Sequence, residues 1–193
     1  MSNEAEYAGG VLSADVRDTT VSGNVAEEGW GGLGLCTATR CTIEGNSADW
    51  AGGTGNGLNR SCLIIDNTAS QAGGGTYSGT NNNCTITENS APIGAGTYDN
   101  TTENSIIYFN SPTNWYAGSF SHSCTIPTAG GTGNITNNPE FMDHQMFPYY
   151  YFLDEGSPCI HAGTNRTWMI GETDLYGGSR IQGSSVDMGT FER

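Results

Sequence analysis

A six-residue motif, seen clearly in Cys41-Thr42-Ile43-Glu44-Gly45-Asn46, recurs at a nearly constant interval through the first two thirds of the chain. Its copies end in Asn residues that are 22, 21, 22 and 21 positions apart, at Asn24, Asn46, Asn67, Asn89 and Asn110. A fixed period of this size is typical of a solenoid, in which each repeat can bury its apolar face only against its neighbours. The period predicts stacked coils of about 21 to 22 residues each.

The residues within the motif indicate a β-strand, because β-branched and apolar side chains alternate with polar ones at a period of two. The first and third positions are small or aliphatic and should face the interior: Thr19, Cys41, Cys62, Cys84 and Ser105, and Val21, Ile43, Ile64, Ile86 and Ile107. The second and fourth positions are mostly polar and should face outward: Thr20, Thr42, Leu63 and Thr85, and Ser22, Glu44, Ile65 and Thr87.

A glycine cluster marks a second point in each coil, as in Gly52-Gly53 and Gly73-Gly74-Gly75. Glycine allows close backbone approach, so these clusters predict a corner between two strands. After the corner comes a Thr/Ser row that should face inward, followed by a row of aromatic residues that should stack outside on adjacent coils, about 4.8 Å apart. The two rows are Thr54, Thr76, Thr97 and Ser119, and Tyr77, Tyr98 and Phe120.

Composition limits the classes of partner. The 193 residues suit one domain, and the net charge of −14 comes from 20 acids against six Arg, with no Lys. Such a surface repels nucleic acid and anionic membranes. No stretch is long and apolar enough to span a membrane, and the first residues do not resemble a signal peptide. A repeat is already under way near Ala8, so we expect further coils upstream in the native protein, or end-to-end association through an open N-terminal coil.

The six cysteines lack the spacing of a zinc site. Cys41, Cys62 and Cys84 share one inward column, which predicts buried free thiols that act as small hydrophobes. A disulfide between adjacent coils stays open as an alternative, since neighbouring strands are close enough. Cys36 and Cys159 lie outside this column and have no assigned role.

The segments Gly73-Gly74-Gly75-Thr76-Tyr77 and Asn83-Cys84-Thr85-Ile86-Thr87-Glu88-Asn89-Ser90-Ala91 resemble the repeats of bacterial right-handed parallel β-helix proteins. That group includes the polymorphic outer-membrane repeats and many secreted polysaccharide-active proteins, and the recurring Asn is similar to the asparagine ladder of the pectate-lyase type. The resemblance implies an all-β, right-handed, single-stranded parallel β-helix of about five to six coils over residues 1–127. It is specific for fold and brings little information on activity.

The C-terminal segment, residues 128–193, resembles the end of bacterial surface proteins sometimes called choice-of-anchor domains. The similar stretches are Asn138-Pro139-Glu140-Phe141, Gly156-Ser157-Pro158-Cys159-Ile160-His161-Ala162-Gly163, Asp174-Leu175-Tyr176-Gly177-Gly178-Ser179-Arg180 and Val186-Asp187-Met188-Gly189-Thr190-Phe191-Glu192. Where this chain has His161, the family pattern has an acid. The resemblance implies an irregular cap packed on the last coil, and an extracellular or cell-surface location. We expect Asp174, Arg180 and Asp187 to be structural residues of this cap.

Two sets of residues are candidates for catalysis. Arg17 and Arg60 occupy one repeat position two coils apart and could grip an anionic sugar, although solvated side chains that balance nearby acids are the simpler interpretation. Asp66 and Glu88 share a position on consecutive coils, and paired carboxylates are what a glycosidase requires. Any acidic β-helix also produces such pairs by chance. A polysaccharide lyase or glycoside hydrolase using these four residues is therefore the alternative function.

A binding surface is the function that the sequence favours. The aromatic residues Tyr77, Tyr98 and Phe120, flanked by Trp115 and Tyr116, could stack against sugar rings while Asn82 and Asp99 hydrogen-bond the hydroxyls. A row of aromatic residues that merely stiffens the sheet is an equally simple interpretation. We predict a non-catalytic, extracellular domain that binds or presents itself to a polysaccharide or cell-surface glycan.

No metal or cofactor is predicted. Calcium stays open as a bound ion, because acidic polysaccharide-active β-helices often use it. A loop site made of Asp143, His144 and Asp154 is conceivable, but loop acids are commonly just solvated.

Overall fold

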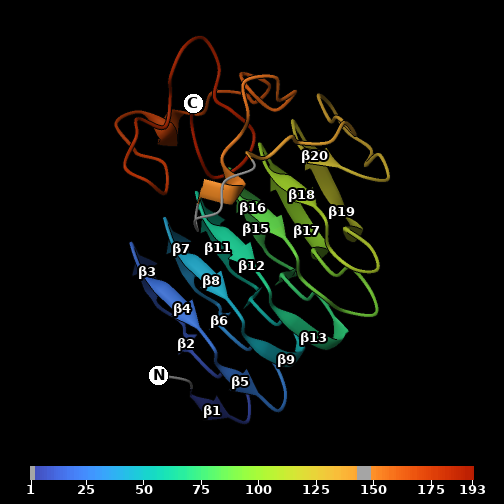
Figure 1. Cartoon of the computed structure of the whole chain (residues 1–193). Coiled ribbons are helices and arrows are strands. Elements are labelled where there is room, and N and C mark those ends of the chain that lie inside the picture. The colour runs from blue at the N-terminus through green and yellow to red at the C-terminus, as the bar shows by residue number, and fades with distance from the viewer. Residues whose placement is uncertain (1–2, 143–148) are drawn as a thin grey trace.

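The computed structural model describes residues 3–142 and 149–193. The chain forms a right-handed parallel β-helix of about six turns (Figure 1). Every pairing between two named strands is parallel, and it joins equivalent positions of consecutive coils. The N and C termini lie at opposite ends of the molecule. The predicted fold class is confirmed.

The repeated motif forms one of three sheets, here called the flank sheet. Its strands are β4 (Thr20–Ser22), β8 (Thr42–Glu44), β12 (Leu63–Ile65), β16 (Thr85–Thr87), β18 (Ile106–Tyr108) and β20 (Cys124–Thr125). The short sheet contains β1 (Glu4–Ala5), which precedes the first flank strand, and β5 (Val25–Ala26), β9 (Ser47–Trp50) and β13 (Thr68–Ala72), which follow β4, β8 and β12.

The third sheet, here called the bent sheet, contributes two strands to each early coil and one long strand to each late coil. Its first half comprises β2 (Val11–Leu12), β6 (Leu33–Gly34), β10 (Thr54–Gly55) and β14 (Thr76–Tyr77). Its second half comprises β3 (Asp15–Arg17), β7 (Thr37–Thr39), β11 (Leu58–Arg60) and β15 (Thr80–Asn82). Strands β17 (Thr97–Glu103) and β19 (Trp115–Ser121) run through both halves.

The coils turn at residues with a left-handed backbone, most of which are not glycine. The bend between the two halves of the bent sheet falls on such residues in all six coils: Ser13, Leu35, Asn56, Ser78, Asp99 and Ala117. Glycine is required in the glycine clusters for a different reason, the close approach of two coils. A Cβ atom on Gly53 would run into the carbonyl oxygen of Gly75 on the next coil, so only glycine allows this close approach.

The interior columns agree with the pattern of the motif. Cys41, Cys62 and Cys84 are fully buried and pack with Ile43, Ile64 and Ile86 in the main hydrophobic core. Beside them the predicted asparagine ladder is present, and each rung donates its side-chain amide to the side-chain oxygen of the next. The ladder satisfies polar groups that would otherwise be orphaned inside the coil.

The outward positions of the flank sheet depart from the expected wet face in the middle coils. Leu63 and Ile65 pack against Tyr151 and Phe191, and the hydroxyl of Thr85 accepts a hydrogen bond from the backbone N–H of residue 190. The C-terminal segment covers this face of the sheet, which explains why two of its outward positions are aliphatic.

The C-terminal segment has two parts with different contacts. Residues 127–137 cover the last coil: the side chain of Asn134 accepts a hydrogen bond from the N–H of Ser123, and Ile135 forms a β-bridge with Cys124. Residues 149–193 carry two short 3₁₀ helices, η1 (Tyr149–Tyr151) and η2 (Thr167–Met169), and contact coils two to five. The segment is therefore attached along the flank as well as at the end.

Buried charged residues organise this segment. Asp174 accepts backbone hydrogen bonds from Tyr176 and Gly178, which closes a turn. The carboxylate of Asp187 accepts two more, from the N–H groups of residues 161 and 193. Arg180 is fully buried and pairs with Glu192. The expected structural roles of Asp174, Arg180 and Asp187 are confirmed.

Candidate functional site

Three tyrosines form a continuous stack on the outside of the corner that follows the glycine clusters. The rings of Tyr77 and Tyr98 lie 4.8 Å apart and 3° from parallel, and those of Tyr98 and Tyr116 lie 5.2 Å apart at 19°. Trp50 closes the stack in an edge-to-face contact with Tyr77, with ring centroids 5.6 Å apart and planes at 72°. We call Trp50, Tyr77, Tyr98 and Tyr116 the aromatic ladder.

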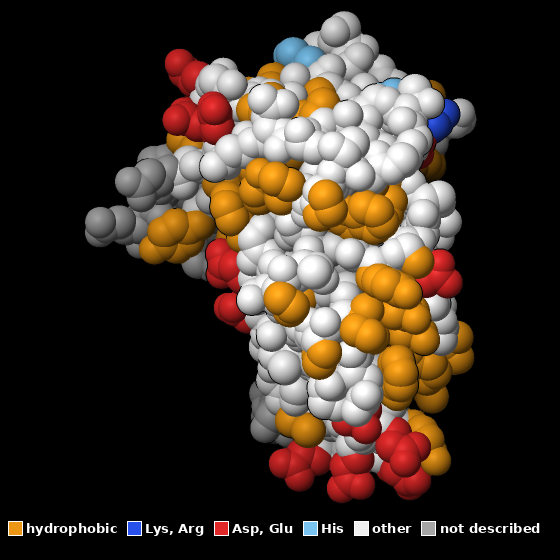
Figure 2. Space-filling model, turned by 90° about the vertical axis from the view of Figure 1, so that its right-hand side faces the viewer, with side chains coloured by type: hydrophobic (Ala, Val, Ile, Leu, Met, Phe, Trp, Pro, Cys, Tyr) orange, Lys and Arg blue, Asp and Glu red, His pale blue; other side chains and the backbone are white. Residues whose placement is uncertain are grey.

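Strand register explains where the ladder ends. The position of Tyr77 is held by Gly55 and Gly34 in the two preceding coils and by Leu12 in the first. The indole of Trp30 lies over both glycines. It is so close that a Cβ atom on either glycine would collide with it. Apolar side chains thus continue from the ladder toward the N-terminal coil, at Trp30 and Leu12. We call these two residues and the aromatic ladder together the apolar strip. Figure 2 shows hydrophobic side chains gathered along one edge of this view, above the acids of the N-terminal end.

The predicted ladder included Phe120, and this register is wrong. Thr97 and Tyr98 pair with Trp115 and Tyr116, whereas Phe120 pairs with Thr102 and is buried in the main core. The last coil is shorter than the others, because Tyr98 pairs with Tyr77, 21 positions before it, but with Tyr116, only 18 positions after it. The side chain of Asn114 takes the place of the next rung of the asparagine ladder, only four positions after Asn110. The coil is three residues short, which moves every later position. Trp115 faces the core against Phe120 and bonds the carbonyl oxygen of Pro127.

The stacking decides what the ladder offers to a ligand. The faces of Tyr77 and Tyr98 are covered by their neighbours, so these residues present ring edges and hydroxyl groups at intervals of about 5 Å. Tyr116 ends the stack and is 52% exposed, and Trp50 at the other end is 42% exposed. A flat sugar ring can therefore stack at an end of the ladder and not along its length.

Two shallow depressions lie at the bend of the bent sheet, one at each end of the solenoid. At the C-terminal end, a depression of about 340 Å³ is lined by Asp99, Asn100, Thr101, Gly118 and Ser119. At the N-terminal end, the equivalent residues Ser13, Ala14, Asp15, Leu35 and Thr37 line a second depression of about 370 Å³. We call these two depressions together the bend groove.

The groove is polar and carries negative charge. Asp99 lines the C-terminal depression and immediately follows Tyr98 of the ladder, while Asp15 lines the N-terminal depression. The hydroxyls of Ser119 and Thr101 are 3.4 Å apart on adjacent strands. Asn82 lies beyond the groove, in register with Arg60 and Glu103 on the outer face of the second half of the sheet. The structure thus brings Asp99 to the ladder and places Asn82 farther away.

The four candidate catalytic residues do not converge. Arg17 and Arg60 share the predicted register, with Thr39 between them, at the end of the bent sheet. Asp66 and Glu88 follow strands β12 and β16, at the opposite edge of the flank sheet. Arg17 is exposed, and the guanidinium of Arg60 lies 5.1 Å from the ring of Trp168. Arg40, one position farther, pairs with Asp18 and Glu172.

Asp66 and Glu88 do form an acidic pair with an aromatic neighbour. Burial raises the pKa of Glu88, the charge of Asp66 raises it further, and a hydrogen bond with Tyr151 opposes the shift. The pKa of Tyr151 is raised by burial and by the nearby carboxylates. Two carboxyl groups in different environments are the arrangement by which glycosidases separate an acid from a base.

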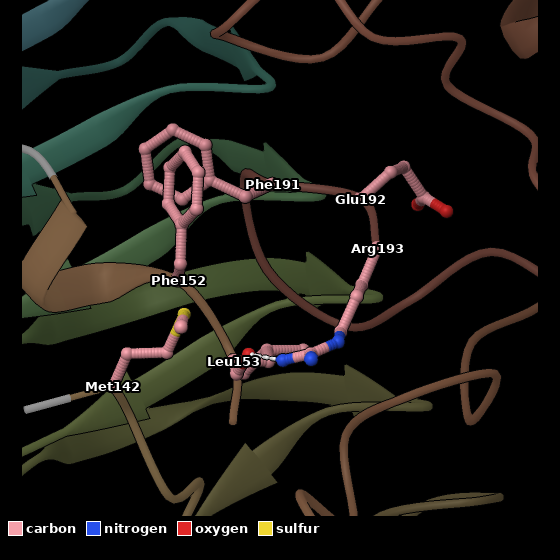
Figure 3. A pocket seen from close by; sticks show the side chains of 6 residues that line it. All are labelled: Met142, Phe152, Leu153, Phe191, Glu192 and Arg193. Carbon is pink, nitrogen blue, oxygen red and sulfur yellow. Dashed lines mark hydrogen bonds between the residues drawn. The ribbon is translucent and has the colours of Figure 1, made fainter. Parts of the chain in front are cut away.

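A pocket lies in the C-terminal segment (Figure 3). It measures about 250 Å³, and the rings of Phe152 and Phe191 lie 4.3 Å apart, tilted by 50°, on one side, with Met142 and Leu153 nearby. Arg193 turns toward the backbone and donates a hydrogen bond from Nη1 to the carbonyl oxygen of Leu153. The pocket adjoins residues 143–148, which the structure does not describe, so we assign it no ligand.

Within residues 3–142 and 149–193, no group of three or more His, Cys, Asp or Glu is placed to hold a metal ion. Asp143 and His144 of the conceivable loop site lie outside these ranges. The same ranges contain no helix long and apolar enough to cross a membrane.

Sequence reasoning missed both tryptophans of the apolar strip. Trp30 and Trp50 stand one and two residues before the glycine pairs Gly31-Gly32 and Gly52-Gly53, so they vary by one position and break the strict period. A search for bulky residues near the glycine corner, instead of at one fixed offset, would have found them.

Comparison of the chain with protein-family models, with curated proteins and with solved structures gives no match. The function must therefore be argued from the geometry of the surface itself.

Proposed function

We propose that this β-helix is an extracellular or cell-surface domain that binds a glycan without cleaving it. The observation that carries the proposal is the aromatic ladder, which extends over several coils and has a polar depression beside its C-terminal end. An elongated surface of this kind suits a chain-like ligand laid along the solenoid axis.

The C-terminal end of the groove supplies the contacts that a sugar residue needs. The exposed ring of Tyr116 offers an apolar face to pyranose C–H groups, and the rim of the depression offers the carboxylate of Asp99 and the hydroxyls of Thr101 and Ser119. Carbohydrate hydroxyls both donate and accept hydrogen bonds, so a carboxylate and two hydroxyls can satisfy them. The tyrosine hydroxyls of the ladder extend this polar rim to the neighbouring coils.

The negative charge of the protein limits which glycans can bind. The groove carries Asp15 and Asp99, and the whole chain carries a net charge of −14. An anionic uronate chain would be repelled, and Arg17 and Arg60 lie outside the depressions that could receive it. We infer that the ligand is a neutral glycan or one that carries amino groups.

The test is binding of soluble neutral, cationic and uronate oligosaccharides, measured by calorimetry on the wild type and on Tyr116→Ala. We expect a neutral or amino glycan to bind and Tyr116→Ala to weaken it at least tenfold. Tyr176→Ala is the matched control, since Tyr176 is equally exposed but lies on the C-terminal segment. Failure of all three classes to bind, or a loss with Tyr176→Ala and none with Tyr116→Ala, would refute the proposal.

A glycoside hydrolase is a second candidate, favoured by one observation: the raised pKa of Glu88 beside Asp66 and Tyr151. In that mechanism Glu88 would be the general acid and Asp66 the base or nucleophile. Incubation with the same oligosaccharides followed by a reducing-end assay separates the two functions. New reducing ends that disappear in Glu88→Gln would replace the binding proposal by this one.

A further inference from the structure

Two cysteines from distant parts of the chain meet where the C-terminal segment packs on the last coils. Cys124 lies in β20, and Cys159 lies in the C-terminal segment, 35 positions later. Both are fully buried in one small apolar cluster with Ile106, Leu153 and Met188. The neighbouring Cys124 thiol and burial raise the pKa of the Cys159 thiol. Tyr108 packs against the same cluster, and burial and both cysteines raise its pKa.

We propose that Cys124 and Cys159 form an intramolecular disulfide that ties the C-terminal segment to the solenoid. The bond would join the last coil to a segment whose other attachments are hydrogen bonds, ion pairs and apolar packing along the flank. Its role goes beyond glycan binding, because neither cysteine lies in the ladder or the groove.

Geometry distinguishes this pair from the column of Cys41, Cys62 and Cys84. Those residues are in register on adjacent parallel strands, so their side chains point the same way, with backbones about 4.8 Å apart. A disulfide needs Cβ atoms about 3.8 Å apart whose bonds turn toward each other. Each thiol of the column donates a hydrogen bond to the carbonyl oxygen two residues before it, and the thiol of Cys62 also interacts with those of Cys41 and Cys84. Cys124 differs, since its thiol bonds the carbonyl oxygen of Asn137 in the covering segment.

The oxidant is a small or protein disulfide, such as oxidised glutathione. The thiolate of Cys159 attacks it, which forms a mixed disulfide and releases one glutathione thiolate. The thiolate of Cys124 then attacks the sulfur of Cys159, which forms the Cys124–Cys159 bond and releases the second glutathione. Two cysteines are oxidised, one glutathione disulfide is reduced, and the two thiol protons pass to the glutathione thiolates.

Burial sets the time at which the bond forms. Both side chains have no exposed surface, and the surroundings raise the pKa of Cys159, so the docked thiols react slowly. Oxidation therefore takes place before the C-terminal segment docks, or when it opens.

The test is refolding of the full chain from denaturant with oxidised and reduced glutathione, followed by thiol titration in denaturant and peptide mass spectrometry. The titratable thiols should fall from six to four, and one cross-linked peptide should join Cys124 to Cys159. The oxidised protein should also resist cleavage in residues 138–193 by a protease that cuts the reduced protein there.

Two variants check the assignment. Cys159→Ala should keep all five remaining thiols free, whereas Cys84→Ala should still lose two thiols to the same cross-link. A cross-link within the Cys41–Cys62–Cys84 column, retention of six thiols in the refolded wild type, or glutathione adducts without the cross-link would overturn the proposal. The wild-type peptide map decides the matter even if a variant folds poorly.

Discussion

The asparagine ladder allows the sharpest prediction about what holds the coils together. Asn67 is fully buried and makes four side-chain hydrogen bonds. Its oxygen accepts from the backbone N–H and the side-chain amide of Asn46, and its nitrogen donates to the carbonyl oxygen of Ile43 and to the side chain of Asn89. Asn67→Ala removes all four.

The magnitude follows from which groups are left without partners. The Asn46 amide keeps its bond to the carbonyl of Val21, and the Asn89 oxygen keeps the backbone N–H of residue 67. The backbone N–H of Asn46 and the carbonyl of Ile43 lose their side-chain partner. An unsatisfied buried backbone group costs about 1–3 kcal/mol, and each other lost bond about 1 kcal/mol. The free energy of unfolding should fall by about 3–5 kcal/mol, a large part of the 5–15 kcal/mol typical of a domain.

Urea unfolding followed by circular dichroism and tryptophan fluorescence measures this change. Thr68→Ala is the control, because Thr68 is the next residue and is exposed, so its change should stay within about 0.5 kcal/mol. Asn67→Asp should also lower the free energy of unfolding, because it keeps the acceptor oxygen but loses the two donated hydrogen bonds and buries a charge. A loss below about 1 kcal/mol for Asn67→Ala would show that the ladder follows from the fold instead of stabilising it.

Two further changes probe the corner and the C-terminal segment. Gly53→Ala should lower the unfolding free energy by about 3 kcal/mol, because the new Cβ atom would meet the carbonyl of Gly75. Gly45→Ala has open space around it and should lower the unfolding free energy by about 1 kcal/mol, because Gly45 has a positive φ. Equal losses for the two variants in urea titrations would contradict the packing argument. Burial raises the pKa of Glu192 to about 7, so its stabilising contribution is complete below its unfolded pKa and is lost as pH rises through 7. The thermal midpoint of the wild type should therefore fall more than that of Glu192→Gln between pH 5 and pH 8; parallel curves would show that Glu192 does not titrate there.

The repeat allowed most of the fold to be predicted, because one strand motif defines the inward column, the corner and the stacking direction together. Cys62 and Ile64 are buried as the alternation indicates. The prediction failed where the period breaks. Three missing residues after Asn110 moved Phe120 from the expected ladder into the core, and no local signal marks a shortened coil. Leu63 and Ile65 were a usable signal of the covered flank, since two aliphatic residues at outward positions require a partner.

The candidate site was less predictable for a physical reason. Tyr77 and Tyr98 could be placed from sequence, but whether their faces are free depends on side-chain torsions that no pattern records. The depression around Asp99 depends on the left-handed bend, which falls on five different residue types in six coils and so leaves no signature in composition.

The backbone spacing of the coils also fixes the interval at which equivalent side chains repeat along the solenoid axis. Successive rungs of the aromatic ladder are 4.8 and 5.2 Å apart because hydrogen bonds between strands set the interval, and no side-chain substitution can change it. A ligand that repeats at the same interval can meet an equivalent group on every coil. A ligand with another repeat would come into step with a few coils and then fall between them, so a glycan bound along the ladder, as proposed, would have to match this interval.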